Sequence, residues 1–237
     1  MIKALLFALM TLLCPALLHA GNTAPTRLYV VVDTATPMAG GYQWLTDTLL
    51  TIKSETSSQP LVLPSFGLHS FDRKVSRTVS SDKQSFKQAL NALTVTPAPV
   101  NGLPAIQRII DDIEHGAHIL LITRDSSPRP KKINFAALAK KFIKKNITMH
   151  LLTDIDFECE EHWIFGVNQH LEGINEKFEY SGCNILTPLH VDRNDYVKLA
   201  LASGGHLWRL EAIKANNIAY GKYLGAEMLD IYGASKP

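Results

Sequence analysis

The sequence is short of cysteine, of net charge and of every glycine-rich motif that marks a nucleotide site. Three cysteines occur in 237 residues, and the formal net charge at pH 7 is +2. So small a charge gives no electrostatic basis for nucleic-acid binding, and the lysines of residues 140–145 are interpreted as the solvated face of a helix. No G-x-G-x-x-G, P-loop lysine or G-x-S-x-G is present. A hydrolase with an unmarked site stays open but has no motif to support it.

The first twenty residues have the composition of a secretory signal. Lys3 precedes an apolar core, Leu5–Leu18, and the small residue Ala20 stands before Gly21. This core is too short to span a bilayer as a helix. We therefore expect cleavage after Ala20, export to the periplasm or out of the cell, and no stable membrane span in the mature chain, residues 21–237.

Export decides how the cysteines are interpreted. Cys14 leaves with the signal, so the mature chain keeps Cys159 and Cys183, and an oxidising compartment favours one disulfide between them. In the loop-entropy model such a bridge contributes roughly 3 kcal/mol. Both lie in residues 154–190, which are too long for a plain connection and are interpreted as an insertion. An alternative is zinc, with four potential ligands: Cys159, His162, His170 and Cys183. Their spacing matches no familiar zinc pattern.

Apolar runs alternate with helical patterns along the chain. Strands are expected at residues 28–32, 63–71, 118–123 and 148–153, with a short edge strand at 77–80 and a last strand near 204–210. Helices are expected at residues 42–53, 82–93, 104–114, 135–145, 195–202 and 212–229. Three of the long strands are continuously apolar, as strands buried on both faces of a parallel sheet must be. His118 and His150, at or in such strands, are interpreted as structural residues rather than ligands.

This alternation predicts an α/β fold. We expect a Rossmann-like three-layer sandwich with a mostly parallel central sheet, one short antiparallel edge strand, and helices on both faces. Ligands of such sheets bind beyond the carboxyl ends of the strands, at the topological switch point. Asp33 and residues 122–126 are expected at that edge.

Seven segments, taken in order, resemble a von Willebrand factor type A (vWA) domain. They are "VVVDTATPM", "FGLHSFD", "SSDKQSFKQALNAL", "NGLPAIQRIIDDI", "HILLITRDSSP", "KKNITMHLLT" and "LALASGGHLWRL". The resemblance covers about residues 28–230. It implies a single vWA-like domain over 21–237, interrupted by the insertion.

The chemistry of that family is a metal-ion-dependent adhesion site (MIDAS), in which acids and hydroxyls hold Mg²⁺ or Mn²⁺. Carried over position by position, the resemblance keeps Asp33. The other ligand positions are occupied by residues without a suitable oxygen: Ala35, Pro37, Gly102 and Arg124. This implies a degenerate MIDAS with no cofactor. A shift in register offers Asp125 with Thr34 and Thr36 instead, which side-chain alternation disfavours.

Arg124 places a permanent cation where the family binds a metal. Its planar fork of donors fits a carboxylate, so we expect an ion pair with Asp33 at the ends of adjacent strands. The alternative is that Arg124 points into solvent.

The function expected from this reasoning is non-enzymatic binding of another protein, without a metal. The insertion and the loop at residues 124–130 are expected to form the contact surface, and the insertion supplies candidate contacts: Trp163, Phe165, Phe178 and Tyr180. Aromatic side chains on a constrained loop are typical anchors for a protein partner, although they also serve to pack a loop onto its domain. Two alternatives remain: metal-dependent adhesion through Asp33 with Mg²⁺ or Mn²⁺, and a hydrolase that uses the switch-point cleft.

Overall fold

The computed structural model describes the greater part of the predicted sheet and its helices. The described residues are 28–34, 44–45, 66–71, 75–80, 83–93, 102–124, 133–154, 157–159, 162–164, 166–167, 170, 172–175, 180–182 and 194–215. The predicted signal at 1–20 and most of the helix expected at 42–53 lie outside them, although Trp44 and Leu45 are helical.

The strands and helices follow the predicted order. The strands are β1 (Leu28–Asp33), β2 (Phe66–Phe71), β3 (Val75–Ser80), β4 (His118–Thr123), β5 (Thr148–Thr153), β6 (Phe157–Cys159), β7 (His162–Ile164), β8 (Gly166–Val167), β9 (Glu172–Ile174), β10 (Tyr180–Gly182) and β11 (Leu207–Arg209). The helices are α2 (Lys83–Asn91), α3 (Gly102–Ile109), α4 (Phe135–Lys145), α5 (Asp195–Ala202) and α6 (Leu210–Ala215).

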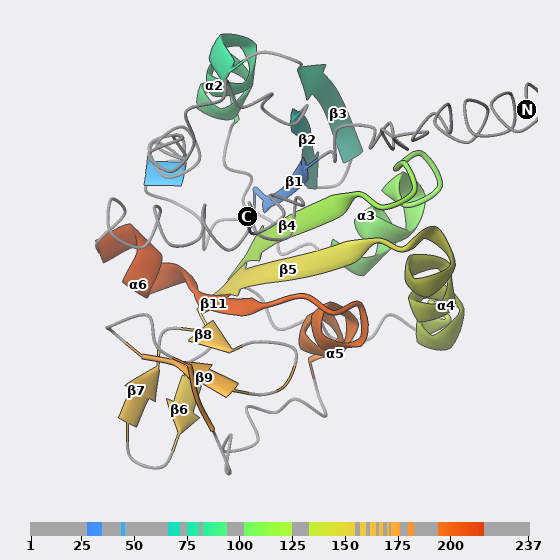
Figure 1. Cartoon of the computed structure of the whole chain (residues 1–237). Helices are drawn as coiled ribbons and strands as arrows, with labels where there is room; N and C mark the ends of the chain where they lie inside the picture. The colour runs from blue at the N-terminus through green and yellow to red at the C-terminus, as the bar shows by residue number, and fades with distance from the viewer. Residues whose placement is uncertain are drawn as a thin grey trace, which may run out of the picture.

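The main sheet has nine strands in the order β10-β9-β8-β11-β5-β4-β1-β2-β3 (Figure 1). The pairs β1–β2, β1–β4, β4–β5 and β5–β11 are parallel, whereas β3 lies antiparallel to β2 at one edge. Within the six strands β3, β2, β1, β4, β5 and β11, the predicted mixed, mostly parallel sheet with its antiparallel edge strand is therefore confirmed. The strand order changes direction between β1 and β4, so the topological switch point lies between them.

Both faces of the central strands are buried. Along β1, Tyr29 and Val31 belong to one apolar cluster, and Leu28, Val30 and Val32 belong to the other. Helices α3, α4 and α5 cover the first face, since their buried side chains pack with Tyr29 and Val31 (Figure 1). Leu90 of α2, Leu45, and Leu210 and Ile213 of α6 cover the second face. The three-layer arrangement with helices on both faces is thus confirmed.

The inserted segment joins the main sheet, which the sequence did not predict. Residues 157–182, hereafter the ribbon, contain β6 to β10. β8 pairs antiparallel with β11, β9 with β8, and β10 with β9, while β6 and β7 form a separate two-stranded sheet. The last predicted strand is therefore an internal strand. An edge at β11 would expose unpaired backbone groups, and the ribbon satisfies them.

Helix ends follow local chemistry. The side chain of Asn134 caps α4 by accepting from the amide of Ala137 at 3.0 Å, and Asn146 ends the helix in the left-handed region with φ of 50°. The prediction for residues 104–114 was wrong in its bounds, because α3 ends at Ile109. Lys145 Nζ donates to the carbonyls of Ile110, Asp111 and Ile113 at 2.7–2.9 Å and so satisfies acceptors beyond that end.

The turn before β11 depends on a close backbone approach at Gly205. An added Cβ there would lie 1.8 Å from the carbonyl oxygen of Met149, whereas at Gly182 it would meet nothing within 4 Å. We predict that Gly205→Ala destabilises the fold by about 1–3 kcal/mol or more, because backbone must move to relieve the clash. Gly182→Ala is the matched control and should change the free energy of unfolding by less than about 0.5 kcal/mol. Urea denaturation of both variants measures this, and equal stabilities would contradict it.

Candidate functional site

A row of buried polar side chains follows the apolar parts of the central strands. Asp33 comes directly after Val32, and Thr123 directly after Ile122, where Val32 and Ile122 are register partners. Thr123 is in turn the register partner of Thr153 on β5. The exposed fraction is 0% for Asp33, 0% for Thr123 and 1% for Thr153. The row therefore lies at the carboxyl ends of three adjacent strands and includes the switch point.

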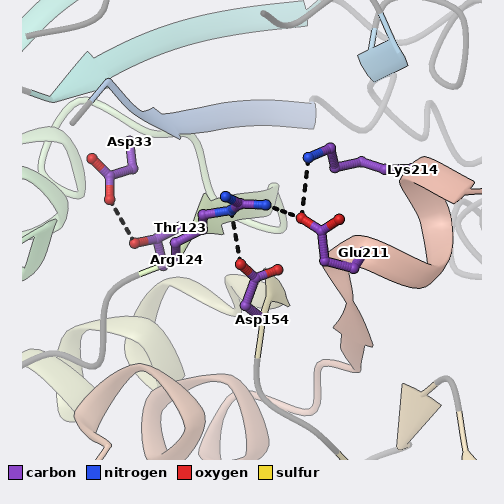
Figure 2. A network of polar contacts seen from close by, with 6 residues as sticks. All are labelled: Asp33, Thr123, Arg124, Asp154, Glu211 and Lys214. Atoms are coloured by element: carbon purple, nitrogen blue, oxygen red, sulfur yellow. Dashed lines mark hydrogen bonds and ion pairs between the residues drawn. The ribbon is translucent and has the colours of Figure 1, made fainter. Parts of the chain in front are cut away.

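Asp33 is held by its neighbour across the switch point. The Thr123 hydroxyl donates to Asp33 Oδ2 at 2.8 Å (Figure 2). Burying a carboxylate is unfavourable unless it accepts hydrogen bonds, so this donor offsets part of the cost. The predicted position of Asp33 at the carboxyl ends of the strands is correct, but its side chain is buried rather than exposed at that edge.

Arg124 does not turn toward Asp33. Its Nε lies 2.7 Å from Asp154 Oδ2, and its Nη2 contacts Glu211 Oε1 (Figure 2). Successive residues of a strand point to opposite faces, and Thr123 already faces Asp33, so Arg124 leaves on the other side. Arg124 thus forms ion pairs, but with Asp154 and Glu211 rather than with Asp33, so the predicted Asp33–Arg124 pair was wrong. The alternative that Arg124 points into solvent was also wrong.

The ion pairs of Arg124 connect three elements. Asp154 directly follows β5, while Glu211 lies in the first turn of α6 and also accepts from Lys214 Nζ at 3.1 Å. Burial lowers the pKa of the Lys214 ammonium, the charge of Arg124 lowers it further, and Asp154 acts in the opposite direction. These groups are one-quarter to one-half exposed. Screening by solvent therefore limits what they contribute to stability.

Sequence reasoning missed the partners of Arg124. Asp154 could have been found, since it follows a predicted strand as Asp33 does and is level with Arg124 through the Thr123–Thr153 pair. Glu211 carried no comparable signal, because it approaches from a helix on the second face of the sheet.

The remaining positions carried over from the family are only partly described. Gly102 is the first residue of α3, is buried, and donates its amide hydrogen to the Tyr196 hydroxyl. Thr34 is buried at 3% exposure. Ala35, Thr36, Pro37 and Asp125 lie outside the described residues. The degenerate MIDAS stays a prediction.

The ribbon residues that were singled out fall on several strands. Cys159 ends β6, Trp163 is in β7 and Tyr180 begins β10. Phe165, Phe178 and Cys183 lie outside the described residues, so the disulfide stays a prediction. Within the part of the chain that the structure describes, no group of three or more His, Cys, Asp or Glu side chains is placed to hold a metal ion.

His118 and His150 lie far from this edge. His118 is the register partner of Leu28, five residues before Asp33, which is about 16 Å along the strand. His118 Nδ1 and His150 Nε2 are 3.1 Å apart, and both side chains are buried. The two rings hydrogen-bond to each other, as their interpretation as structural residues requires. A search of the described helices finds none that is both long and apolar enough to cross a membrane.

We predict that Thr123→Val destabilises the protein by about 1–3 kcal/mol, because it removes a donor from the buried Asp33 carboxylate while preserving shape. Thr123→Ser keeps the hydroxyl and should lose less. In an Asp33→Asn background the effect of Thr123→Val should shrink, giving a coupling energy of about 0.5–3 kcal/mol in a double-mutant cycle. Additive losses in chemical denaturation would show that the bond does not hold Asp33.

Comparison with known proteins yields solved structures only. No family model matches the chain, and no curated protein matches it. Similar structures include proximal thread matrix protein 1 from the mussel byssus, at 11% identity and a TM-score of 0.41 over 54% of this chain and 35% of that one. A second structure of that protein, with a zinc-occupied MIDAS motif, gives the same values. A third gives 12% identity and a TM-score of 0.41 over 74% of this chain and 46% of that one. The chain thus spans less than half the length of these proteins, and so distant a likeness carries no conclusion about function.

Proposed function

We propose that this chain is an exported, non-enzymatic protein-binding module of the vWA type. It acts without a bound metal, and the ribbon of residues 157–182 is its contact surface. The observation that carries the proposal is the way the ribbon is built: its inner strands extend the main sheet, while β6 and β7 form a separate sheet outside it.

The base of the ribbon is firmly attached. Val167, Gly173 and Ile174 are buried, and β8 forms a register with β11 through Leu207–Val167 and Trp208–Gly166. A rigid scaffold that positions a variable segment is a common basis for recognition. Tyr180 in β10 is connected to β11 through β9 and β8, so the main sheet sets its backbone position, which lowers the entropy lost when a partner is bound. Trp163 is in β7, which pairs with β6 outside the main sheet.

The geometry at the switch point supports metal independence. A MIDAS metal needs several oxygen ligands and one position open to a carboxylate of the partner. Asp33 is 0% exposed and accepts from Thr123. Gly102, Ala35 and Pro37 have no side-chain oxygen to add. These residues do not fit an octahedral Mg²⁺ or Mn²⁺ site.

The same geometry does not favour a hydrolase. General acid–base catalysis needs the two groups within hydrogen-bond reach. The buried histidines His118 and His150 lie toward the amino ends of the strands, whereas Asp33 lies at the carboxyl end. Among the described residues, no observation favours the alternative enzymatic function.

The metal-independent proposal predicts that divalent cations do not stabilise the mature protein. A cation that binds only the folded state would raise stability by about 2.7 kcal/mol at a hundredfold excess over its dissociation constant. We therefore expect the same melting temperature in Mg²⁺, Mn²⁺, Ca²⁺ and a chelator. A cation-dependent rise that is absent in Asp33→Asn would favour metal-dependent adhesion instead.

The contact surface is tested by covalent cross-linking of the tagged chain in the exported fraction of the producing cell, followed by direct binding to the purified partner. Trp163→Ala and Tyr180→Ala should each weaken that binding by tenfold or more, since aromatic anchors typically contribute 2 kcal/mol or more, about thirtyfold. Ile143→Ala is the matched control, because Ile143 is an apolar side chain on α4 that is 67% exposed. Equal affinities for the ribbon variants and the wild type would exclude the ribbon as the contact surface, as would a loss confined to Ile143→Ala.

A further inference from the structure

Four aromatic rings form a continuous row across the second face of the sheet. They belong to His118 of β4, His150 of β5, His206 just before β11, and Trp208 of β11. Ring centroids are 5.4 Å apart for His118–His150, 5.6 Å for His150–His206 and 5.6 Å for His206–Trp208, all in stacked orientation. This row of rings leads from β4, a central strand, to β11, the strand with which the ribbon pairs. None of the four residues belongs to the polar side chains described above at the carboxyl ends of the strands.

Hydrogen bonds determine where the protons lie on the two buried imidazoles. The backbone N–H of His206 donates to His150 Nδ1 at 3.2 Å. His150 Nδ1 is therefore an acceptor, so the neutral ring carries its hydrogen on Nε2. That hydrogen points to His118 Nδ1 at 3.1 Å, which leaves the hydrogen of neutral His118 on its own Nε2.

An added proton cannot be accommodated without losing one of these bonds. If His150 takes the proton, its Nδ1 becomes a donor. If His118 takes it, the bond between the rings survives only when His150 accepts through Nε2 and carries its hydrogen on Nδ1. A hydrogen on His150 Nδ1 opposes the backbone N–H of His206, whereas keeping that hydrogen on Nε2 breaks the bond to protonated His118 instead. One of the two bonds at risk is therefore the N–H anchor of His206, whose carbonyl also accepts from the amide of Leu151 at 2.9 Å.

Trp208 transmits the position of β11 to the ribbon. Its buried ring lies against Gly166 of β8, where an added Cβ would be 2.6 Å from Trp208 Cε3. Trp208 and Gly166 are also register partners in the β11–β8 pair. A shift of His206 and Trp208 therefore acts on the strand by which the ribbon joins the sheet.

The charged groups around the row do not favour the added proton. Burial lowers the pKa of His118 to about 4. Burial, and then the charges of His118 and His206, lower the pKa of His150 well below its usual range. Of the described elements on this face, α6 brings Glu211, which contacts Arg124 near the carboxyl ends, and Lys214, which contacts Glu211. Helix α2 and residues 44–45 bring the apolar Leu90 and Leu45. The folded-state pKa values of His118 and His150 lie below the unfolded value of about 6.5. The two neutral rings therefore contribute fully to the free energy of unfolding above that pH, and this contribution is lost as the pH falls below it.

We propose that the histidine row is an acid-sensitive device that controls the attachment of the ribbon, holding it at neutral pH and releasing it when the His118–His150 pair takes up a proton. The inference rests on the proposed function, because it assigns the regulation of the same surface. Its test needs no partner, so the two can fail separately.

The test is hydrogen–deuterium exchange of the mature protein at about pH 7.5 and about pH 5, corrected for intrinsic exchange rates. Amides of β8, β9 and β11 should lose protection by about tenfold or more at the lower pH, while those of β1 and β4 change by less than about twofold. Equal protection of the ribbon at both pH values would overturn the proposal, and so would an equal loss in β1.

Two variants distinguish a role of His118 in the response to acid from a purely structural role. His118→Asn retains an acceptor near the position of Nδ1 but removes one of the two titrating rings, so the ribbon should lose less protection at about pH 5 than in the wild type. His115→Asn, at an exposed histidine in the turn before β4, should respond as the wild type does. An unchanged acid response in His118→Asn would contradict the proposal. Should that variant not fold, long-range ¹H–¹⁵N spectra of the wild type decide, because the proposal requires the Nε2–H form of both His118 and His150 at neutral pH.

Discussion

The structure depends on the burial of β1, β4 and β5 on both faces. A strand in that position can carry polar side chains only where its apolar run begins or ends, unless each polar group finds a partner. Asp33, Thr123 and Thr153 stand at the carboxyl ends, and His118 stands at the amino end of β4. His150 lies inside β5 and is accommodated by bonds to His118 and His206. Each of these buried polar side chains of β1, β4 and β5 is therefore either terminal or hydrogen-bonded.

The carboxyl ends of the central strands differ in character from the edge of the sheet beyond β11. At the carboxyl end, Asp33 is enclosed with Thr123, and on the other side of the strands the cations Arg124 and Lys214 pair with the anions Asp154 and Glu211 (Figure 2). This arrangement neutralises the charges at the edge where an α/β sheet usually binds its ligand. The proposed contact surface is instead the ribbon, which continues the sheet beyond β11. Binding by the ribbon and an enclosed switch point are thus consistent with each other.

Local patterns were sufficient for the central elements because those elements carry their own signals. β4, β5, α4 and α5 have the bounds expected from sequence, since apolar runs and helical periodicity mark them directly. In the structure, Asn134 and Asn194 cap the two helices. The bounds of α3 were less accurate, and the carbonyls beyond its end are satisfied by Lys145, a residue of another helix. The prediction of the Arg124 partner was wrong for a similar reason, since that partner also belongs to a distant element. Alternation of side chains could have excluded Asp33, but Glu211 comes from α6, and no local pattern placed it there.

The sequence by itself determined the layered α/β fold, the antiparallel edge strand and the position of Asp33, because periodicity and strand ends are local properties. Only the tertiary structure decided that the ribbon joins the main sheet through β8 and β11, and that three histidines and Trp208 form one row. Strand pairing across an insertion depends on backbone groups, which all residues share. The stacking of His118, His150 and His206 depends on register between strands that are far apart in the chain. Neither the strand pairing nor the stacking can be predicted from any single segment of the sequence.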